Sequence, residues 1–254
     1  MMKVTDFKEK LSIFNKFGFE IPPVALKFSP TKPQGLEQLD GVLDFCEMLP
    51  EAQKGKSFYA TKENFSCVAP FLLGMKEGDP VFESGCVGPF LGAFKDSKAN
   101  QRVYYTIPKL HRGTVNYVMF SPIDDLNFDP HVLIFTAKVN QAEIILRGLS
   151  YDNGKMWIAK GTTVIACAWL FIYPYLTGEI NFTITGLGFG MRARRLFPEG
   201  LILLSIPSDR LAQLVNNLKE MPWQPISYSL GREGHKRRVK EITQQIKKEL
   251  GLEE

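Results

Sequence analysis

The 254-residue sequence is poor in several residue types, and each shortage argues against a class of protein. Four cysteines are too few for a disulfide scaffold, and three histidines argue against a multi-histidine metal site. Its longest apolar run, residues 164–175, is much shorter than the roughly 20 residues of a membrane span. Charged residues within the first ten positions do not fit a signal peptide. We therefore expect a cytoplasmic protein with no membrane partner.

An excess of charge of one sign is also missing. The chain has 31 basic and 27 acidic residues, whereas nucleic-acid-binding proteins gather positive charge on one face, so we expect no nucleic-acid partner. Neither a Gly-x-Ser-x-Gly motif nor a His-Glu-x-x-His motif occurs, which argues against common hydrolases and zinc proteases. What the chain has is an apolar content of 44%, enough for an ordinary folded core.

Pairs of similar segments recur about 100 residues apart. Residues 23–29 resemble residues 130–136, residues 55–60 resemble residues 154–159, and an apolar segment with a cysteine follows each Gly-Lys pair. These matches keep the same order, which favours an ancient duplication over coincidence. The sequence therefore predicts an α/β (or α+β) fold of two tandem pseudo-symmetric halves, packed as one globular unit.

The domain boundaries follow from this repeat. We expect an N-terminal helix over residues 1–20, a first half over 21–120, a second half over 121–220 and a charged helix over 221–254. Each half should contain a strand, a helix, an aromatic strand, a helical segment with its cysteine and a final strand that ends in Ile-Pro. The apolar spacing within residues 36–46 predicts the helix of the first half. A narrow apolar stripe should pack the C-terminal helix onto the rest of the chain.

Cys67 and Cys167 occupy related positions in the two halves. Cys67 stands where a helix should begin, and the positive end of a helix dipole can lower a thiol pKa, so Cys67 is the candidate catalytic residue. If the halves are related by symmetry, Cys167 would approach the same cleft. The alternative is that both are small apolar core residues. No pair of cysteines has the spacing of a zinc or iron–sulfur motif, so no metal site is predicted.

Residues 185–195 form a glycine-rich turn with three arginines. Glycine allows backbone N–H groups to approach an anion closely, and arginine adds a charged pair of donors. This combination suits a carboxylate or a phosphate, although a basic surface turn is the alternative. The predicted ligand-binding residues are Gly186, Gly188, Gly190, Arg192, Arg194, Arg195 and Cys167.

Several of these segments together resemble the family called domain of unknown function 169, which is uncharacterised and common in anaerobic bacteria and archaea. The segments that carry the resemblance are residues 23–28, Cys46 with Gly55-Lys56, Tyr59-Ala60-Thr61 with Cys67, residues 129–135, Cys167, Gly190-Met191-Arg192, Glu199 and Ile206-Pro207. The resemblance implies that Cys46, Cys67 and Cys167 are more than core thiols. Family members often carry a Cys-x-Gly-x-Arg-like turn, but residues 187–192 contain no cysteine, which argues against a metal or redox centre that needs it.

Three hypotheses of function follow. The first is a protein that binds a small anionic ligand or cofactor in a cleft between the halves. The second is a thiol-dependent enzyme with Cys67 as nucleophile or redox residue and a glutamate or His131 as base. The third is a homodimeric interaction protein that uses the aromatic residues or the C-terminal helix. The sequence identifies no cofactor and leaves open whether the protein is an enzyme.

Overall fold

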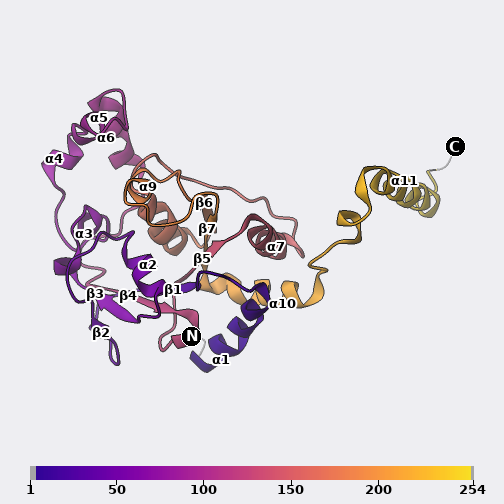
Figure 1. Cartoon of the computed structure of the whole chain (residues 1–254), viewed down its shortest axis with the longest axis horizontal. Helices are drawn as coiled ribbons and strands as arrows, with labels where there is room; N and C mark the ends of the chain where they lie inside the picture. Colours follow the sequence, from indigo (N-terminus) through magenta and orange to yellow (C-terminus); the bar gives the residue numbers. More distant parts are fainter. Residues whose placement is uncertain (1–3, 253–254) are drawn as a thin grey trace.

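A seven-stranded sheet forms the centre of the molecule in the computed structural model, which describes residues 4–252 (Figure 1). The strand order is β2-β3-β4-β1-β5-β7-β6, and all neighbours are antiparallel except β2 and β3. The strands are β1 Val24–Ser29, β2 Glu37–Gln38, β3 Phe58–Ala60, β4 Tyr117–Pro122, β5 Val132–Ala137, β6 Asn181–Ile184 and β7 Ile202–Pro207. Every residue of β5 is buried, as expected of a central strand covered on both faces. The predicted mixed α/β class is confirmed.

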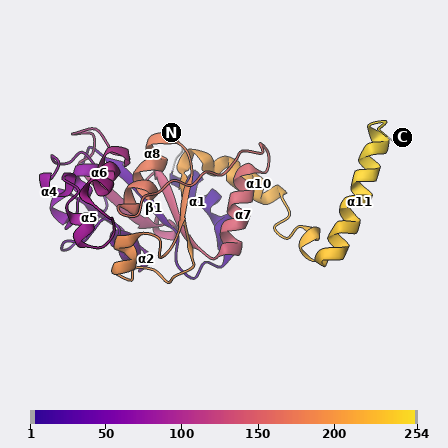
Figure 2. The ribbon, with the colours of Figure 1, turned by 90° about the horizontal axis from the view of Figure 1, so that it is seen from above.

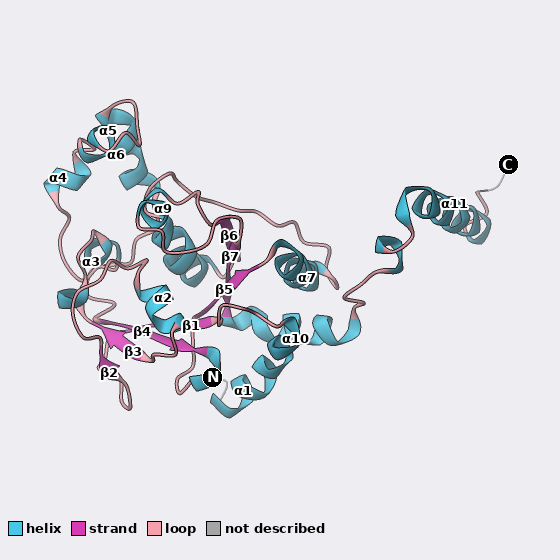
Figure 3. Cartoon of the chain, viewed as in Figure 1, coloured by secondary structure: helices cyan, strands magenta, loops and turns pink. Residues whose placement is uncertain are grey.

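Helices cover both faces of this sheet and extend beyond it (Figures 2 and 3). The α-helices are α1 Val4–Leu11, α2 Met48–Gln53, α3 Ala69–Leu72, α4 Pro80–Glu83, α5 Val87–Phe90, α6 Ser97–Thr106, α7 Val139–Ser150, α8 Tyr173–Thr177, α9 Phe189–Ala193, α10 Leu211–Glu220 and α11 Gly231–Glu249. The short 3-10 helices are η1 Ser12–Phe17, η2 Lys62–Asn64, η3 Ile123–Asp125, η5 Ser208–Arg210 and η6 Ile226–Tyr228, and η4 Ala168–Ile172 is a π-helix. Within residues 4–252, no helix combines the length and hydropathy that a membrane crossing requires.

Two hydrophobic cores lie on opposite faces of the sheet. The first joins the sheet to α1, α7 and α10. The second joins it to α2, α3 and η4, and it contains Phe45, Phe120 and Phe171. The rings of Phe45 and Phe171 meet edge to face with centroids 4.8 Å apart, a favourable aromatic geometry. This packing brings the loop before α2 and the π-helix η4 together, although they are far apart in the sequence.

The helix predicted over residues 36–46 is wrong. This segment contains β2 and turns instead, and α2 begins only at Met48. The reason is that its backbone bonds to another segment. The N–H of Leu43 donates to the carbonyl of Asn64, and the Asn64 amide donates to the carbonyls of Leu39 and Gly41. These long-range hydrogen bonds satisfy the backbone groups that a helix would have paired locally.

Other predicted elements were confirmed in one half and wrong in the other. Residues 58–60 form β3, but residues 157–159 lie in an exposed segment without regular structure. The Ile206-Pro207 pair ends the strand β7, but Ile107 follows the helix α6 instead of ending a strand. The side chain of Asp96 caps the start of α6 by accepting the N–H of Ala99. The strands β1 and β5 do pair at the centre of the sheet. The pseudo-symmetric halves are therefore not confirmed.

The C-terminal helix α11 projects away from the rest of the molecule (Figures 1 and 2). None of its residues is buried, and its apolar stripe is exposed. The stripe consists of Val239, Ile242, Ile246 and Leu250. A charged helix was expected over residues 221–254, and α11 occupies residues 231–249 of that range, whereas residues 253–254 lie outside the described residues. The expected packing of the stripe onto the rest of the chain was wrong, because α11 stands clear of the sheet.

Candidate functional site

Three of the four cysteines line one small cavity, which we call the thiol pocket. Its volume is about 120 Å³. The lining residues are Asp44, Cys46, Cys67, Val68, Ile165, Ala166, Cys167, Gly190, Met191 and Arg194. Cys46 and Cys67 lie in loops that lead into α2 and α3, and Cys167 lies in the helical turn that continues into η4. The expectation that Cys67 and Cys167 approach one cleft therefore agrees with this geometry, and Cys46 joins them.

Direct contacts between two loops position Cys46 and Cys67. The N–H of Ser66 donates to the carbonyl of Leu43 over 3.1 Å, and the Ser66 hydroxyl donates to the Asp44 carboxylate over 2.7 Å. The N–H of Phe45 donates to the sulfur of Cys67 over 3.3 Å. Because residues 43–45 and 65–67 run side by side in parallel, the two thiols face the same pocket.

The backbone before Cys167 is strained. Ile165 has a φ of 62°, in the left-handed region that β-branched residues very rarely adopt. Such a conformation costs on the order of 1–3 kcal/mol and persists only where the surrounding structure enforces it. The π-helix η4 begins directly after Cys167, and π-helical turns are frequent at functional sites. Ile165 itself lines the thiol pocket, and η4 follows directly after the pocket residue Cys167.

Three charged side chains form a group at this pocket, and two of them, Asp44 and Arg194, line it. Arg194 forms an ion pair with the buried Asp44, and its Nε lies 3.9 Å from a carboxylate oxygen of Glu47. Glu47 also accepts the N–H of Asp44 over 2.7 Å. Arg194 in addition donates to the carbonyl of Gly190 over 3.0 Å. The guanidinium of Arg194 therefore contacts two carboxylates of its own chain, so it is not free to bind an anionic ligand.

All three thiols of the pocket are protonated near neutral pH. Burial raises the pKa of Cys46 to about 12, and the neighbouring Cys67 adds to the effect. Burial also raises the pKa of Cys67, although backbone N–H groups of Phe45 and Ala69 oppose it, and raises that of Cys167 well above its ordinary value. The lowered pKa expected for Cys67 is thus wrong, because burial outweighs the donors at the start of the four-residue helix α3.

The predicted glycine and arginine residues do not form one anion site. Gly190 and Arg194 line the thiol pocket, whereas Gly186, Arg192 and Arg195 line a separate cavity of about 70 Å³. There the Arg192 Nε lies 3.3 Å from a carboxylate oxygen of Glu199. Gly186 and Arg195, at the two ends of the turn, line the same small cavity, whereas Gly190 and Arg194 between them line the thiol pocket. The short helix α9 lies within this stretch, and successive positions of a helix face different sides.

His131 and Cys86 lie outside the thiol pocket. The ring of His131 stacks on Tyr175 with centroids 4.7 Å apart and accepts the N–H of Phe28 over 3.3 Å. His131 is therefore not placed to act as a base for Cys67, which corrects that expectation. Cys86 is exposed, on the segment between α4 and α5.

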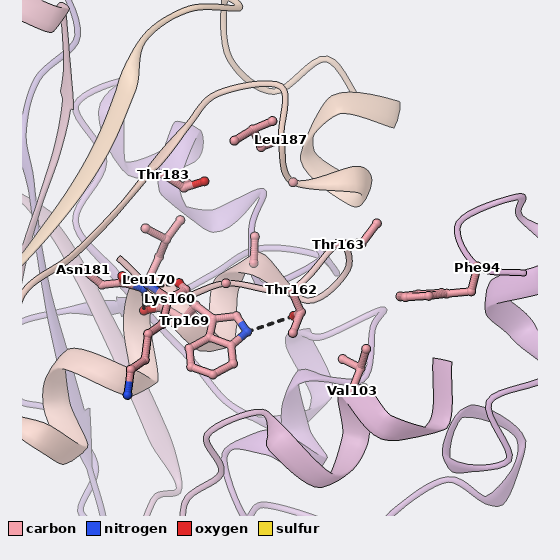
Figure 4. A pocket seen from close by; sticks show the side chains of 13 residues that line it. Phe94, Val103, Lys160, Thr162, Thr163, Trp169, Leu170, Asn181, Thr183 and Leu187 are labelled. Atoms are coloured by element: carbon pink, nitrogen blue, oxygen red, sulfur yellow. Dashed lines mark hydrogen bonds between the residues drawn. The ribbon is translucent and has the colours of Figure 1, made fainter. Parts of the chain in front are cut away.

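A larger cavity of about 420 Å³ adjoins the thiol pocket (Figure 4). Ala166 lines both. The residues around the large cavity are Phe94, Val103, Lys160, Gly161, Thr162, Thr163, Ala166, Trp169, Leu170, Asn181, Thr183, Leu187 and Gly188. The predicted residue Gly188 belongs to this set, and Figure 4 shows the indole of Trp169 beside Thr162, to which its N–H donates over 2.9 Å.

Asn181 holds one wall of the large cavity in place. Its side-chain oxygen accepts the N–H of Lys160 over 2.8 Å, and its amide donates to the carbonyls of Lys160 and Trp169, each over 2.9 Å. The residue is almost completely buried in the edge strand β6. Sequence reasoning missed Lys160, Trp169 and Asn181. The one available signal was a polar residue at the start of an apolar strand.

No set of three or more His, Cys, Asp or Glu side chains within residues 4–252 is spaced to hold a single metal ion. The chain matches no curated protein and no solved structure. A family model described as uncharacterised ArCR does match, over residues 12–217, which is most of the chain. That range includes the thiol pocket and the large cavity, and the resemblance drawn from the short motifs is confirmed. The chain belongs to the domain of unknown function 169 (DUF169) family.

Proposed function

We propose that this protein binds a small anionic organic molecule or cofactor in the large cavity. The observation that carries the proposal is a cavity of about 420 Å³ that meets, at Ala166, a pocket with three cysteines. Ligand sites in proteins occupy roughly 300–1,000 Å³ and combine apolar walls with a few polar groups. Here Trp169 and Phe94 supply flat apolar surface. The hydroxyls of Thr163 and Thr183 make no hydrogen bond within residues 4–252 and are free to bind a ligand.

Lys160 supplies the positive charge in this proposal. Its ammonium lies 5.3 Å from the ring centre of Tyr173, and it has no carboxylate partner within the described residues. Its four-carbon stem is flexible enough to turn the ammonium toward a ligand in the cavity. Arg194 was expected to bind the anionic ligand, but it already forms contacts with the carboxylates of Asp44 and Glu47. We therefore assign the binding of the anion to Lys160. Gly188 lines the large cavity and Gly190 lines the thiol pocket.

Two matched probes test the proposal. Naphthalene-2-carboxylate and its neutral amide have the same flat shape, and isothermal titration calorimetry gives their affinities. We expect Lys160→Gln to weaken carboxylate binding about tenfold, which corresponds to about 1.4 kcal/mol, and to leave amide binding unchanged. Lys219→Gln, on the exposed side of α10, is the control. If neither probe binds at millimolar concentration, the proposal is contradicted.

A thiol-dependent enzyme is the second candidate. The observation that favours it is the backbone N–H of Phe45 directed at the sulfur of Cys67, which would stabilise a thiolate there. In this proposal Glu47 is the base, because its carboxylate contacts Arg194, which lines the pocket that holds Cys67. This proposal requires Cys67 to react with an electrophile faster than Cys46 does. Peptide mass spectrometry after limited alkylation of the native protein measures that order, and equal protection of both cysteines at every pH contradicts it.

Self-association is a third proposal, and the exposed stripe of α11 supports it. A 19-residue helix is only marginally stable alone in water, so burial of the stripe against a second copy would stabilise it. Light scattering of wild type and of Ile242→Glu tests this proposal. A halved mass for the variant supports a homodimer, and a monomeric wild type contradicts it. We also propose that the protein is cytoplasmic, as expected from its sequence.

A further inference from the structure

The thiol pocket gathers three cysteines that form no disulfide. They come from three separate segments of the chain, and they line one shared cavity. That space, about 120 Å³, is several times the roughly 10–15 Å³ that one water molecule needs. An open pocket lined by free thiols is an unusual use of buried cysteine, which ordinarily packs as a small apolar side chain.

The spacing of these donors excludes one kind of site. A single zinc or copper ion draws all its ligand atoms to one point, and within residues 4–252 no group of side chains is spaced in that way. In an iron–sulfur cluster each thiolate binds a different iron atom at the edge of the cluster, so the cysteine sulfurs stand farther apart around a central volume. Three thiols that line one open volume, with no common point of coordination, are compatible with the second arrangement.

We propose that Cys46, Cys67 and Cys167 hold an iron–sulfur cluster in the thiol pocket. Each thiol would give up its proton to solvent and bind one iron atom as a thiolate. No fourth cysteine lines the thiol pocket, so one iron atom would be left to take a ligand other than these three thiols. Ala166 lines both the thiol pocket and the large cavity. This inference concerns the thiol pocket and goes beyond the ligand proposed for the large cavity.

The surroundings of the sulfurs suit bound thiolates. The N–H groups of Phe45 and Ala69 hydrogen bond to the sulfur of Cys67, and the N–H of Ala168 is directed at that of Cys167. Backbone donors of this kind orient thiolate ligands and set the reduction potential of iron–sulfur centres. Val68 and Met191 line the pocket with apolar surface that limits the access of water.

Reconstitution of the full-length chain tests the proposal. Protein prepared without oxygen is incubated with ferric iron, sulfide and dithiothreitol, which reduces part of the iron, and is then desalted and assayed for bound iron, acid-labile sulfide and visible charge-transfer absorption. We expect wild type to bind iron and sulfide in equal amounts. The variants Cys46→Ala, Cys67→Ala and Cys167→Ala should each lose at least about tenfold of the bound iron. Cys86→Ala should bind as wild type does, since Cys86 is exposed outside the pocket.

A measurement on wild type alone guards against variants that fail to fold. After reconstitution, alkylation and peptide mass spectrometry should find Cys46, Cys67 and Cys167 protected and Cys86 modified. Absence of bound iron and sulfide in wild type overturns the proposal. Iron without sulfide, or equal loss of iron in Cys86→Ala, overturns it as well. The test is independent of the ligand proposal, because Lys160→Gln should retain the full cluster content while it weakens the carboxylate probe.

Discussion

The backbone N–H of Phe45 donates to the sulfur of Cys67 across 3.3 Å, although 22 residues separate them in the sequence. This contact joins the loop before α2 to the loop before α3. It also explains how Cys46, one residue after Phe45, reaches the same pocket as Cys67. The packing of these two loops therefore fixes the positions of both thiols.

Thiol reactivity should separate Cys86 from the cysteines of the pocket. Cys86 is exposed, whereas burial raises the pKa of Cys46 to about 12 and raises those of Cys67 and Cys167. Because the thiolate is the reactive form, iodoacetamide at pH 8 should modify Cys86 first. Peptide mass spectrometry of the native chain gives the order. Modification of Cys46 as fast as Cys86 would show that the pocket is open to solvent.

Stability should fall in alkaline solution. The pKa of Cys46 rises on folding from its ordinary value of 9.0 to about 12, so between these values the folded state holds a proton that the unfolded state has lost. The free energy of unfolding then decreases as pH rises through this window, by on the order of a few kcal/mol. Urea unfolding of wild type and Cys46→Ala at pH 8, 9 and 10 measures it. We expect a smaller decrease for the variant, and equal slopes would contradict the assignment to Cys46.

The ion pair of Arg194 and Asp44 should matter more than the exposed pair of Arg192 and Glu199. The Asp44 side chain is only 7% exposed, so Arg194→Gln leaves a nearly buried carboxylate without its cation. We expect a loss of about 1–2 kcal/mol, reduced from the cost of a fully buried pair because Arg194 is partly exposed. Arg192→Gln should cost less than about 0.5 kcal/mol. In urea unfolding, the double variant with Asp44→Asn should lose less than the two single losses combined.

The strain at Ile165 predicts a reversal of the usual order of alanine and glycine. Both substitutions remove the same side-chain contacts, but glycine tolerates a φ of 62° without a steric penalty and alanine does not. Ile165→Gly should therefore be more stable than Ile165→Ala by about 1 kcal/mol, although glycine ordinarily destabilises relative to alanine. Thermal unfolding of the two variants decides the order. An alanine variant that is the more stable of the two would contradict the strain.

The three hydrogen bonds of Asn181 should stabilise the wall of the large cavity. Asn181→Ala leaves the N–H of Lys160 and two carbonyls without their partner, at an expected cost of about 2 kcal/mol. Thr183→Ala, in the same strand, is the matched control, because the Thr183 hydroxyl makes no hydrogen bond within the described residues and its loss should cost little. Urea unfolding measures both. Similar losses for the two variants would argue against the role assigned to Asn181.

Removal of α11 should leave the body of the protein intact. No residue of α11 is buried, so a chain that ends at Leu230 loses no core contact. We expect its melting temperature to stay within about 2 °C of wild type at low protein concentration. A larger decrease that depends on protein concentration would instead show that α11 stabilises an assembly.

Elements with strictly local causes were predicted well from the sequence. Short unbroken apolar runs predicted the strands β1 and β5, as is typical of strands that are buried on both faces. Apolar residues spaced at the period of 3.6 residues predicted the helix α10. The same rule gave a wrong prediction for residues 36–46, where a helix was expected. The leucines of this segment have helical spacing, but bonds to Asn64 and Ser66 fix its backbone otherwise.

The candidate site was predicted only in part. The sequence selected Cys67 and Cys167 through the repeat, and the family resemblance added Cys46. It could not show that Arg194 contacts Asp44, that Arg192 belongs to another cavity, or that Asn181 orders a cavity wall. Each of these facts depends on which distant segments meet, and that is decided by packing on a shared face of the sheet.

By itself the sequence determined the mixed α/β class, the positions of most strands, and the thiols available for chemistry, since these follow from composition and local periodicity. Only the tertiary structure decided that three thiols share one pocket, that burial keeps them protonated, and that the C-terminal helix stands apart. Proximity and burial are properties of long-range contacts, in which residues separated by more than 20 and in part by more than 100 positions are brought together by the aromatic core around Phe45 and Phe171.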